Sequence, residues 1–583
     1  MSKDNVLKPS STKNVEIKLD ILHNDELQSE LRTLKELFEA SYGPTGRTSL
    51  IQHHTGGHVT VTSSASQILK NITTVSTPLT RLLLQAVQGH LNQFNDGGLF
   101  TAFLALQLID SSITSGLARH TAIAINELAL TTILKKLENS HPFIKLPADL
   151  GNMDQMLCVI RSILATKPAS GLSTNEIQSL AVLLLRGFLS CVPTADGKTV
   201  SLDNLRIQGC EGPPCSESCL KKGILLEAKC PPITESSESK DDIKVALFDC
   251  SLAGNVEDRW LDGAKTELSS NVVTIEDNVL TLMKMMVDDL VKHGVKLIAC
   301  QKVIHPTLQQ HITRKGVHVI ERLSIDYIDA VQKLTGARLF SSFQCDMSAE
   351  GFGSLAEVKS LVLHKRRFVH LIPHSSLKHD ISTLLLCGPD EHSLDELKIL
   401  CCAVFQSLKQ LVYNPFLVPG GGCFETMIAG LLMQAAAEFD SSKEVDCSKY
   451  QFSKGLHSVA STFFHIARTL DHDGNNHLVD RTTFHHWVTP PLATVDTTTL
   501  RKCLCGLVTS TQDMEWNMTE ELRDLSQDLS RGTYICRSLM DDVKNYKHAV
   551  LDVMSMKANA MMTAFETANT ILRIKHFIKE TFE

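Results

Sequence analysis

The sequence SYGPTGRTSL, residues 41–50, decides where the first long helix ends. Upstream of it, apolar residues recur with the spacing of one helix face, at Leu27, Leu31, Leu34 and Phe38. Gly43 and Pro44 then stop the helix, because proline lacks the amide hydrogen that a further turn requires. Such a glycine-rich turn also lets backbone amides approach a phosphate closely, since glycine has no Cβ. On its own, this stretch therefore fits either a nucleotide loop or an ordinary helix stop.

A second glycine-rich stretch, NDGGLFT at residues 95–101, precedes an apolar helix expected at residues 98–110. Asp96 stands directly before that helix, where an aspartate is a common N-cap, since its carboxylate accepts hydrogen bonds from the free amides of a first helical turn. Other roles of Asp96 remain open at this stage.

A third stretch, VPGGGCFE at residues 418–425, precedes another helix. Gly421 and Gly422 could let the backbone approach a ligand, or could permit tight packing between a loop and a helix without any ligand. The two interpretations carry about equal weight.

Composition describes an ordinary globular protein that is large enough for several domains. The chain has 583 residues, a formal net charge of −8, 43% hydrophobic residues and 21% charged residues. The acidic balance argues against nucleic-acid binding, and the lack of a run of about 18 apolar residues argues against a membrane span. The polar residues 1–24 predict a flexible tail and no signal peptide, so the seventeen cysteines are expected to be reduced in the cytosol.

The middle of the chain alternates between strand and helix patterns, which predicts a parallel sheet with crossover helices. Strands are expected at residues 243–250, 295–300, 317–320 and 337–340. Helices are expected between them, at residues 279–290, 307–314 and 325–334. Further helices are expected at residues 154–164, 175–188 and 558–578, whereas residues 208–242 predict mostly loops.

Two groups of residues suggest metal ligands without matching a familiar spacing. Four cysteines fall in the proline-rich segment, at Cys210, Cys215, Cys219 and Cys230. A zinc site is conceivable there, but the spacing contains no CxxC pair and no histidine joins it, so reduced thiols are preferred. The sequence DHDGNNH at residues 471–477 and the pair His485 and His486 are interpreted as polar surface turns.

Together, the three glycine-rich stretches resemble the nucleotide pocket of group II chaperonins (CCT/TCP-1), whose motifs read LGPxGxxK, GDGTT and GGGxxE. Residues 299–339 resemble the chaperonin apical domain, and AFETANTILRI at residues 564–574 resembles the last chaperonin helix. The resemblance implies a multidomain α plus α/β fold. Its expected parts are an equatorial domain (25–144 and 411–583), an intermediate domain (145–211 and 371–410) and an apical domain (212–370), with client contacts around residues 255–275.

The resemblance also implies a candidate site for ATP and magnesium, with Asp96 as the magnesium ligand. The matching residues are Gly43, Pro44, Asp96, Gly97, Gly98, Gly421 and Gly422.

Several chaperonin residues are replaced in that candidate site. In the family, an aspartate in the pattern DExERSLHDAL positions the attacking water, and an alignment from Asp395 and Glu396 puts Ala403 at its place. A methyl group cannot orient water, and phosphoryl transfer depends largely on positioning and charge. The family's TNDG turn corresponds to residues 62–65, and the lysine of its first motif corresponds to Ser49. We therefore expect no catalytic residue and negligible turnover.

These departures resemble one divergent branch of the family, the vertebrate chaperonin-like Bardet–Biedl proteins. The resemblance implies an assembly factor for the BBSome, the ciliary trafficking complex. Its implied partners are other chaperonin-like Bardet–Biedl proteins, the cytosolic chaperonin and BBSome subunits, at a cytoplasmic, pericentriolar location near the ciliary base. Two alternatives remain open: an active ATP-dependent subunit of a folding ring, and a centrosomal scaffold.

Overall fold

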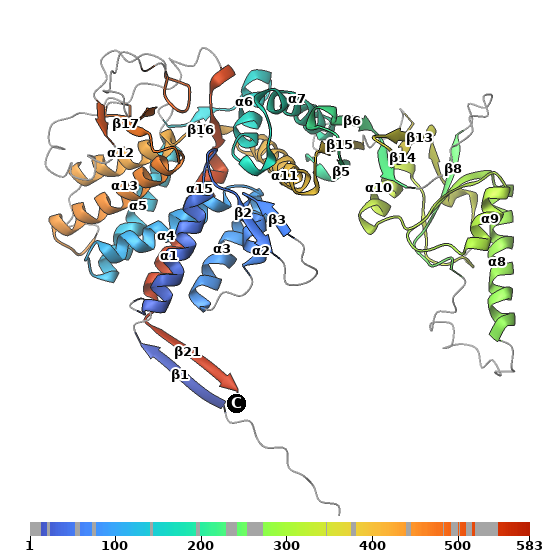
Figure 1. Cartoon of the computed structure of the whole chain (residues 1–583), viewed down its shortest axis with the longest axis horizontal. Helices are drawn as coiled ribbons and strands as arrows, with labels where there is room; N and C mark the ends of the chain where they lie inside the picture. The colour runs from blue at the N-terminus through green and yellow to red at the C-terminus, as the bar shows by residue number, and fades with distance from the viewer. Residues whose placement is uncertain are drawn as a thin grey trace, which may run out of the picture. The chain divides into compact units, whose positions relative to one another are not determined.

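The computed structural model shows a mixed α and β chain that separates into two compact units (Figure 1). The helical unit contains residues 1–181 and 395–583, and the sheet unit contains residues 182–394. The structure describes residues 13–19, 22, 24–52, 59–72, 77–139, 144–193, 199–228, 242–253, 272–344, 347–374, 381–438, 445–481, 483–490, 500, 502–508, 516–518 and 546–582. The client contacts expected around residues 255–275 fall largely outside this part, as does Cys230.

The helical unit is built around α4 (Gly98–Thr114), which is apolar on nearly all sides and therefore lies in the core. Four helices pack against it: α1 (Asp25–Ala40), α3 (Pro78–Phe94), α13 (Lys449–Thr469) and α15 (Met554–Arg573). Two more, α5 (Arg119–Asn139) and α12 (Cys423–Glu438), pack against α13. The first helix, α1, and the last helix, α15, thus both pack against α4.

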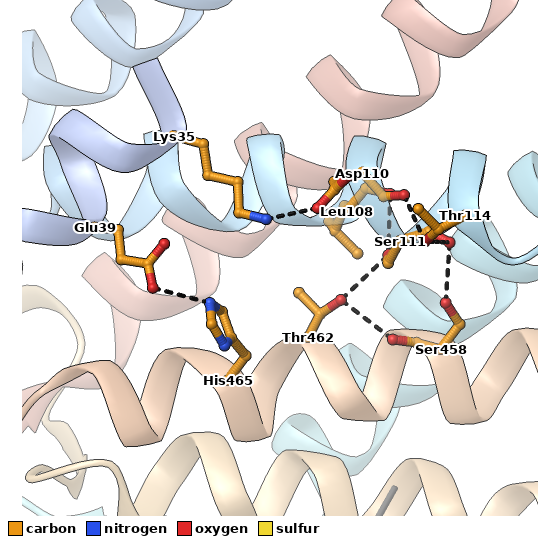
Figure 2. A network of polar contacts seen from close by, with 9 residues as sticks. All are labelled: Lys35, Glu39, Leu108, Asp110, Ser111, Thr114, Ser458, Thr462 and His465. Carbon is orange, nitrogen blue, oxygen red and sulfur yellow. Dashed lines mark hydrogen bonds and ion pairs between the residues drawn. The ribbon is translucent and has the colours of Figure 1, made fainter. Parts of the chain in front are cut away.

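The first helix follows the prediction. In α1, the buried side chains are Leu27, Leu31, Leu34 and Phe38, and Asn24 caps its start by accepting hydrogen bonds from two backbone amides. Figure 2 shows the polar contacts that hold it in place. Lys35 Nζ lies 2.5 Å from Asp110 Oδ2 on α4, and His465 Nε2 on α13 lies 3.2 Å from Glu39 Oε1. These contacts fix the end of α1, immediately before Gly43.

The two ends of the described chain pair with each other, which corrects two predictions. Residues 13–19, predicted as part of a flexible tail, form β1 (Lys13–Leu19), which pairs antiparallel with β21 (His576–Phe582). The last helix was predicted to reach residue 578 but ends at Arg573, where the chain becomes extended. Because each strand depends on a partner at the other end of the sequence, local periodicity does not reveal the pair.

Small sheets complete the helical unit. A hairpin pairs β2 (Ser49–Gln52) with β3 (Val59–Thr62), and the short helix α2 (Ala65–Asn71) follows it. The order β20-β16-β4 joins residues Leu551–Val553, Phe416–Pro419 and Leu146–Pro147. The order β18-β17-β19 joins His486–Thr489, Asn476–Asp480 and Trp516–Met518. The glycines at residues 420–422 directly follow β16, and the amide of Gly420 donates a hydrogen bond to Val550 O, just before β20.

The sheet unit contains the predicted parallel sheet, with the strand order β10-β9-β8-β11. Its strands are β8 (Ile243–Phe248), β9 (Val295–Cys300), β10 (His318–Ile320) and β11 (Leu339–Phe340), and β12 (Gly353–Leu355) adds to β8 antiparallel. The buried side chains of the sheet form two clusters. Helices α8 (Val272–Lys292) and α9 (Pro306–Arg314) belong to the cluster that contains Ala246, Phe248 and Ile298. Helix α10 (Ile325–Thr335) belongs to the cluster that contains Val245, Leu247 and Leu297. The alternation in the sequence therefore gave the correct sheet and its crossover helices.

The prediction of loops at residues 208–242 is wrong for the first part of that segment. Three strands occur there: β5 (Leu205–Glu211), β6 (Cys219–Lys222) and β7 (Ile224–Glu227). The first two flank β15 (Ser382–Gly388), while β7 pairs with β14 (Arg366–Ile372), which pairs with β13 (Glu357–Leu363). The strands are too short to show a clear alternation, and their partners come from a distant segment.

Three further helices lie near the sequence boundaries between the two units: α6 (Met153–Leu164), α7 (Thr174–Cys191) and α11 (Glu391–Tyr413). The first two match the helices predicted near residues 154–164 and 175–188. In the part of the chain that the structure describes, no helix combines the length and the apolar composition needed to cross a membrane.

The packing of α13 leads to a testable expectation for stability. Phe463 is fully buried and its ring stacks on Phe565 of α15, with centroids 6.3 Å apart. Phe463→Ala should lower the free energy of unfolding by about 3–5 kcal/mol, because it removes buried area and leaves a cavity. Urea unfolding followed by circular dichroism measures this. Tyr450→Ala on the same helix, where the side chain is 73% exposed, serves as the control and should change stability little.

Candidate functional site

The three glycine-rich stretches surround one buried ammonium group, that of Lys557 on α15. Its Nζ lies 2.5 Å from Oε1 of Glu425, the last residue of the third stretch, and 3.2 Å from Asp552 Oδ2 on β20. It also lies 4.2 Å from the ring centroid of Phe100, which belongs to the second stretch. A buried charge is tolerated when it is paired, so two carboxylates and an aromatic face account for its position.

Tyr42 brings the first stretch to the same place. Burial raises the pKa of its phenol, and the charges of Lys557, Glu425, Asp552 and Asp96 all act on that pKa. The carbonyl oxygen of Tyr42 accepts a hydrogen bond from His472 when Nε2 of that ring carries the proton, with the two atoms 2.8 Å apart. The structure thus gathers all three predicted stretches around one group of charges.

Asp96 does not cap the helix that follows it, so the N-cap interpretation is wrong. The N-cap of α4 is Gly97, in the left-handed conformation with φ 76°, and no side chain caps this helix start. Asp96 is half-buried, and it interacts with His90, whose pKa burial lowers while Asn559 and Asp96 oppose that shift. The carboxylate remains a candidate magnesium ligand.

The glycines of the candidate site are in close contact with other protein groups. A Cβ added to Gly43 would lie 2.9 Å from Leu470 O, and one added to Gly97 would lie 2.6 Å from Met556 Sδ. At Gly421 and Gly422 the nearest atoms would belong to Leu504, at 2.8 Å, and to His486 Nδ1, at 2.9 Å. Gly98 has the same restriction against Leu91, and Pro44 is exposed. Packing alone therefore accounts for these glycines, whether or not a nucleotide binds.

Ala403 lies in α11 and is buried. One turn later on the same face, Gln406 Nε2 donates a hydrogen bond to the backbone oxygen of Gln93, 2.6 Å away near the end of α3. This contact brings the part of α11 that carries Ala403 close to the turn that contains Asp96. A methyl group thus occupies the position where the resemblance expects a carboxylate.

The same helix contributes a buried acid, Glu396. Thr62 Oγ1 donates a hydrogen bond to Glu396 Oε1, and the amide of Ser64 donates to Thr62 Oγ1 over 2.9 Å. Burial raises the pKa of Glu396, while Thr62, Lys167 and the amides of Ser63 and Ser64 oppose the shift. The residues aligned with the family's TNDG turn therefore hold a protein carboxylate.

The prediction that the pair of adjacent histidines, His485 and His486, forms a polar surface turn is wrong. His485 and His486 are 1% and 0% exposed, at the start of β18. Three cysteines lie beside them: Cys423, Cys503 and Cys505. Within the surface turn predicted at residues 471–477, residues 471–476 lie at the surface or partly so, but His477 is buried in β17, so the prediction is wrong for that residue. The available sequence signal was the spacing Cys-x-Cys at residues 503–505, which is not one of the common paired spacings.

Of the four cysteines in the proline-rich segment, the structure describes Cys210, Cys215 and Cys219, and none of these three is part of a disulfide. Cys210 and Cys215 are buried and Cys219 is partly buried. Cys210 lies opposite Cys387 in the pairing of β5 with β15. Within the described residues, these thiols do not converge on a common point as metal ligands would.

The raised pKa of Glu396 gives an expected pH dependence. The folded chain binds this proton more tightly than the unfolded chain, whose reference pKa is 4.5. The resulting contribution to stability is complete below that pH and is lost as the pH rises through the raised pKa. Glu396→Gln imitates the protonated form, so its melting temperature should exceed the wild-type value by roughly 2–4 °C at pH 8. The difference should shrink toward pH 4.5.

The matched control is Asp395→Asn, because Asp395 is only half-buried and pairs with Lys398 over 2.9 Å. Differential scanning fluorimetry across pH measures both variants. An equal gain from Asp395→Asn, or a Glu396→Gln gain that does not change with pH, would contradict the assignment.

Known proteins resemble this chain over its length. Human "Molecular chaperone MKKS" is 28% identical over 593 residues, covering all of both chains. The mouse protein of the same name is 28% identical over 587 residues. Thermosome subunit alpha of Saccharolobus solfataricus is 24% identical over 569 residues, covering 96% of this chain and 91% of that one. A model of the TCP-1/cpn60 chaperonin family matches residues 34–581. This chain is therefore a member of the TCP-1/cpn60 chaperonin family.

Proposed function

We propose that this chain is a chaperonin-like assembly factor that does not depend on efficient ATP hydrolysis. Its substrates in this proposal are BBSome subunits, and it acts with other chaperonin-like Bardet–Biedl proteins and the cytosolic chaperonin near the ciliary base. The single observation that carries the first part is Ala403, a buried methyl group in α11, whose Gln406 contacts the end of α3 three residues before Asp96. The BBSome assignment is supported by the resemblance of the sequence to the Bardet–Biedl branch.

The candidate nucleotide site fits a binding role better than a catalytic one. Asp96 offers carboxylate oxygens of the kind that magnesium prefers. A magnesium ion held there would supply positive charge to offset the negative charge of a phosphate group. Lys557 is already paired with Glu425 and Asp552, so its charge is largely satisfied within the protein. In this proposal any ATP that binds through Gly43, Gly97 or Gly421 serves to stabilise a conformation, and it is released unhydrolysed.

Two strand pairs offer a route to assembly with similar chains. In the described part of the chain, β1 pairs with β21 and β2 pairs with β3, each as a two-stranded sheet. A two-stranded sheet leaves unpaired backbone groups along its outer edges, which another strand can join. Leu50 on β2 and Ile578 on β21 are 71% and 63% exposed. Exposed apolar side chains on open strand edges suit the addition of a strand from a partner.

The catalytic part of the proposal is tested by phosphate release. Purified wild-type chain with ATP and magnesium should release phosphate at the rate of a protein-free blank. Ala403→Asp should remain at that level, because the lysine of the first motif is also replaced, by Ser49. A ring chaperonin measured in parallel supplies the positive control. Turnover by the wild-type chain at a comparable rate would refute the proposal and favour an active folding subunit.

The assembly part is tested by isolating the tagged chain from ciliated cells, with and without ATP, and measuring native mass and composition. We expect a discrete complex that contains chaperonin-like chains and BBSome subunits. Leu50→Lys combined with Ile578→Lys should reduce that complex several-fold, because it places charge on both strand edges. Tyr450→Lys, at an equally exposed position on a helix, should leave it intact.

The same isolation separates the alternatives. A ring of this chain alone that changes mass with ATP would support the active folding subunit. Recovery of centrosomal material without any chaperonin-like partner or client would support a scaffold.

A further inference from the structure

We propose that the helical unit contains a structural zinc site whose four ligands are Cys423, His485, Cys503 and Cys505. None of these ligands is among the candidate nucleotide-binding residues, although Cys423 directly follows Gly422, and the inference does not depend on the proposed function.

The first support is that one ligand atom of each residue converges on a common point. All four atoms lie within 4.8 Å of one another. Cys503 Sγ lies 3.1 Å from Cys505 Sγ, which in turn lies 3.3 Å from His485 Nδ1. In a tetrahedral zinc site, bonds of about 2.3 Å to sulfur and 2.0 Å to nitrogen place the ligand atoms roughly 3.5–3.8 Å apart. Shifts of about 1 Å or less would complete that geometry.

The second support is burial. The four side chains are 0–1% exposed. Structural zinc sites are closed, with four protein ligands and no coordinated water, whereas catalytic sites keep one position open. Three cysteines and one histidine are a standard structural donor set, and soft thiolate ligands select zinc over magnesium or calcium. Burial and donor type therefore both indicate a structural ion.

The third support comes from the backbone around the sulfur atoms. The amide of His486 donates to Cys423 Sγ over 3.4 Å, and the amide of Val508 donates to Cys503 Sγ over 3.3 Å. Amides directed at sulfur stabilise the thiolate charge that a metal ligand carries. Gly506, with φ 71°, closes the turn between these positions, and a Cβ there would meet His548 O at 2.4 Å. The segment is thus shaped as a tight turn around its sulfurs.

Such an ion would join three segments that are distant in sequence: the start of α12, the start of β18 and the loop at residues 502–508. That loop contains no helix or strand, and backbone bonds hold it at both sides, from Leu504 N to His486 O and from Val550 N to Cys505 O. Leu504 is also the residue that packs against Gly421. The zinc ion would therefore fix the third glycine stretch from within the protein.

Metal content of the purified full-length chain tests the proposal. Mass spectrometry of metals should find about one zinc per chain, and a thiol-blocking mercurial should release it to a chromogenic chelator. Replacement by cobalt should give intense sulfur-to-cobalt charge-transfer bands. Absence of zinc from protein prepared in zinc-supplemented medium would overturn the proposal. Zinc whose cobalt form lacks those bands would also overturn it, because surface histidines could hold such an ion.

Variants provide a second, independent readout. Cys503→Ser should lower zinc content at least several-fold, whereas Cys401→Ser should retain it, because Cys401 is equally buried but lies outside the cluster. His485→Cys preserves a zinc-binding set and should keep the metal while shifting the cobalt spectrum. If Cys503→Ser does not fold, the wild-type cobalt spectrum still decides. Full zinc content in a folded Cys503→Ser protein, or a Cys503–Cys505 disulfide in freshly purified wild-type chain, would contradict the site.

Discussion

The buried ammonium of Lys557 is the constraint on which the arrangement of the candidate site depends. Removing one partner from a buried ion pair typically costs about 3–5 kcal/mol, because the remaining charge stays without compensation. Glu425, Asp552 and the ring of Phe100 must therefore remain around it. They lie in the first turn of α12, in β20 and in the first turn of α4, respectively. Three distant segments are held together by a protein charge, with no phosphate required.

The glycine stretches fit the same conclusion. A phosphate loop needs backbone amides that face free space, since the anion must approach them closely. Here the position that a Cβ would take is occupied by Met556 and His90 at Gly97, and by Leu504 at Gly421, so these glycines are required by packing even without a bound anion. The glycines thus allow close packing of protein against protein. A retained glycine motif is consequently weak evidence for ATP hydrolysis. The alanine at position 403, where the resemblance expects an aspartate, is direct evidence against it.

Periodic segments could be predicted from the sequence because their signal is local. The stripe from Leu27 to Phe38 and the alternation in residues 243–340 predicted α1 and the parallel sheet correctly. Strands such as β1 and β7 could not be predicted, because their pairing depends on residues far away. The same limit applied to the candidate site: Asp96 and Ala403 were found through motifs, but His485 was misassigned to the surface. Its partners, Cys423 and Cys503, are near it only in the folded chain.

If the pocket does not turn over nucleotide, as we propose, the contacts that stabilise it can change without loss of activity. A pocket that binds and releases a ligand exchanges between conformations, so permanent internal links would hinder that exchange. In this chain Lys557 pairs with Glu425 at the end of the third glycine stretch, and Leu504, which lies between two of the zinc ligands that we propose, packs against Gly421. Links of this kind stabilise one conformation and oppose exchange between several. A single stable conformation suits the assembly factor that we propose, because such a protein presents a constant surface to its partners. It would be a disadvantage in a protein that changes conformation with each cycle of ATP hydrolysis.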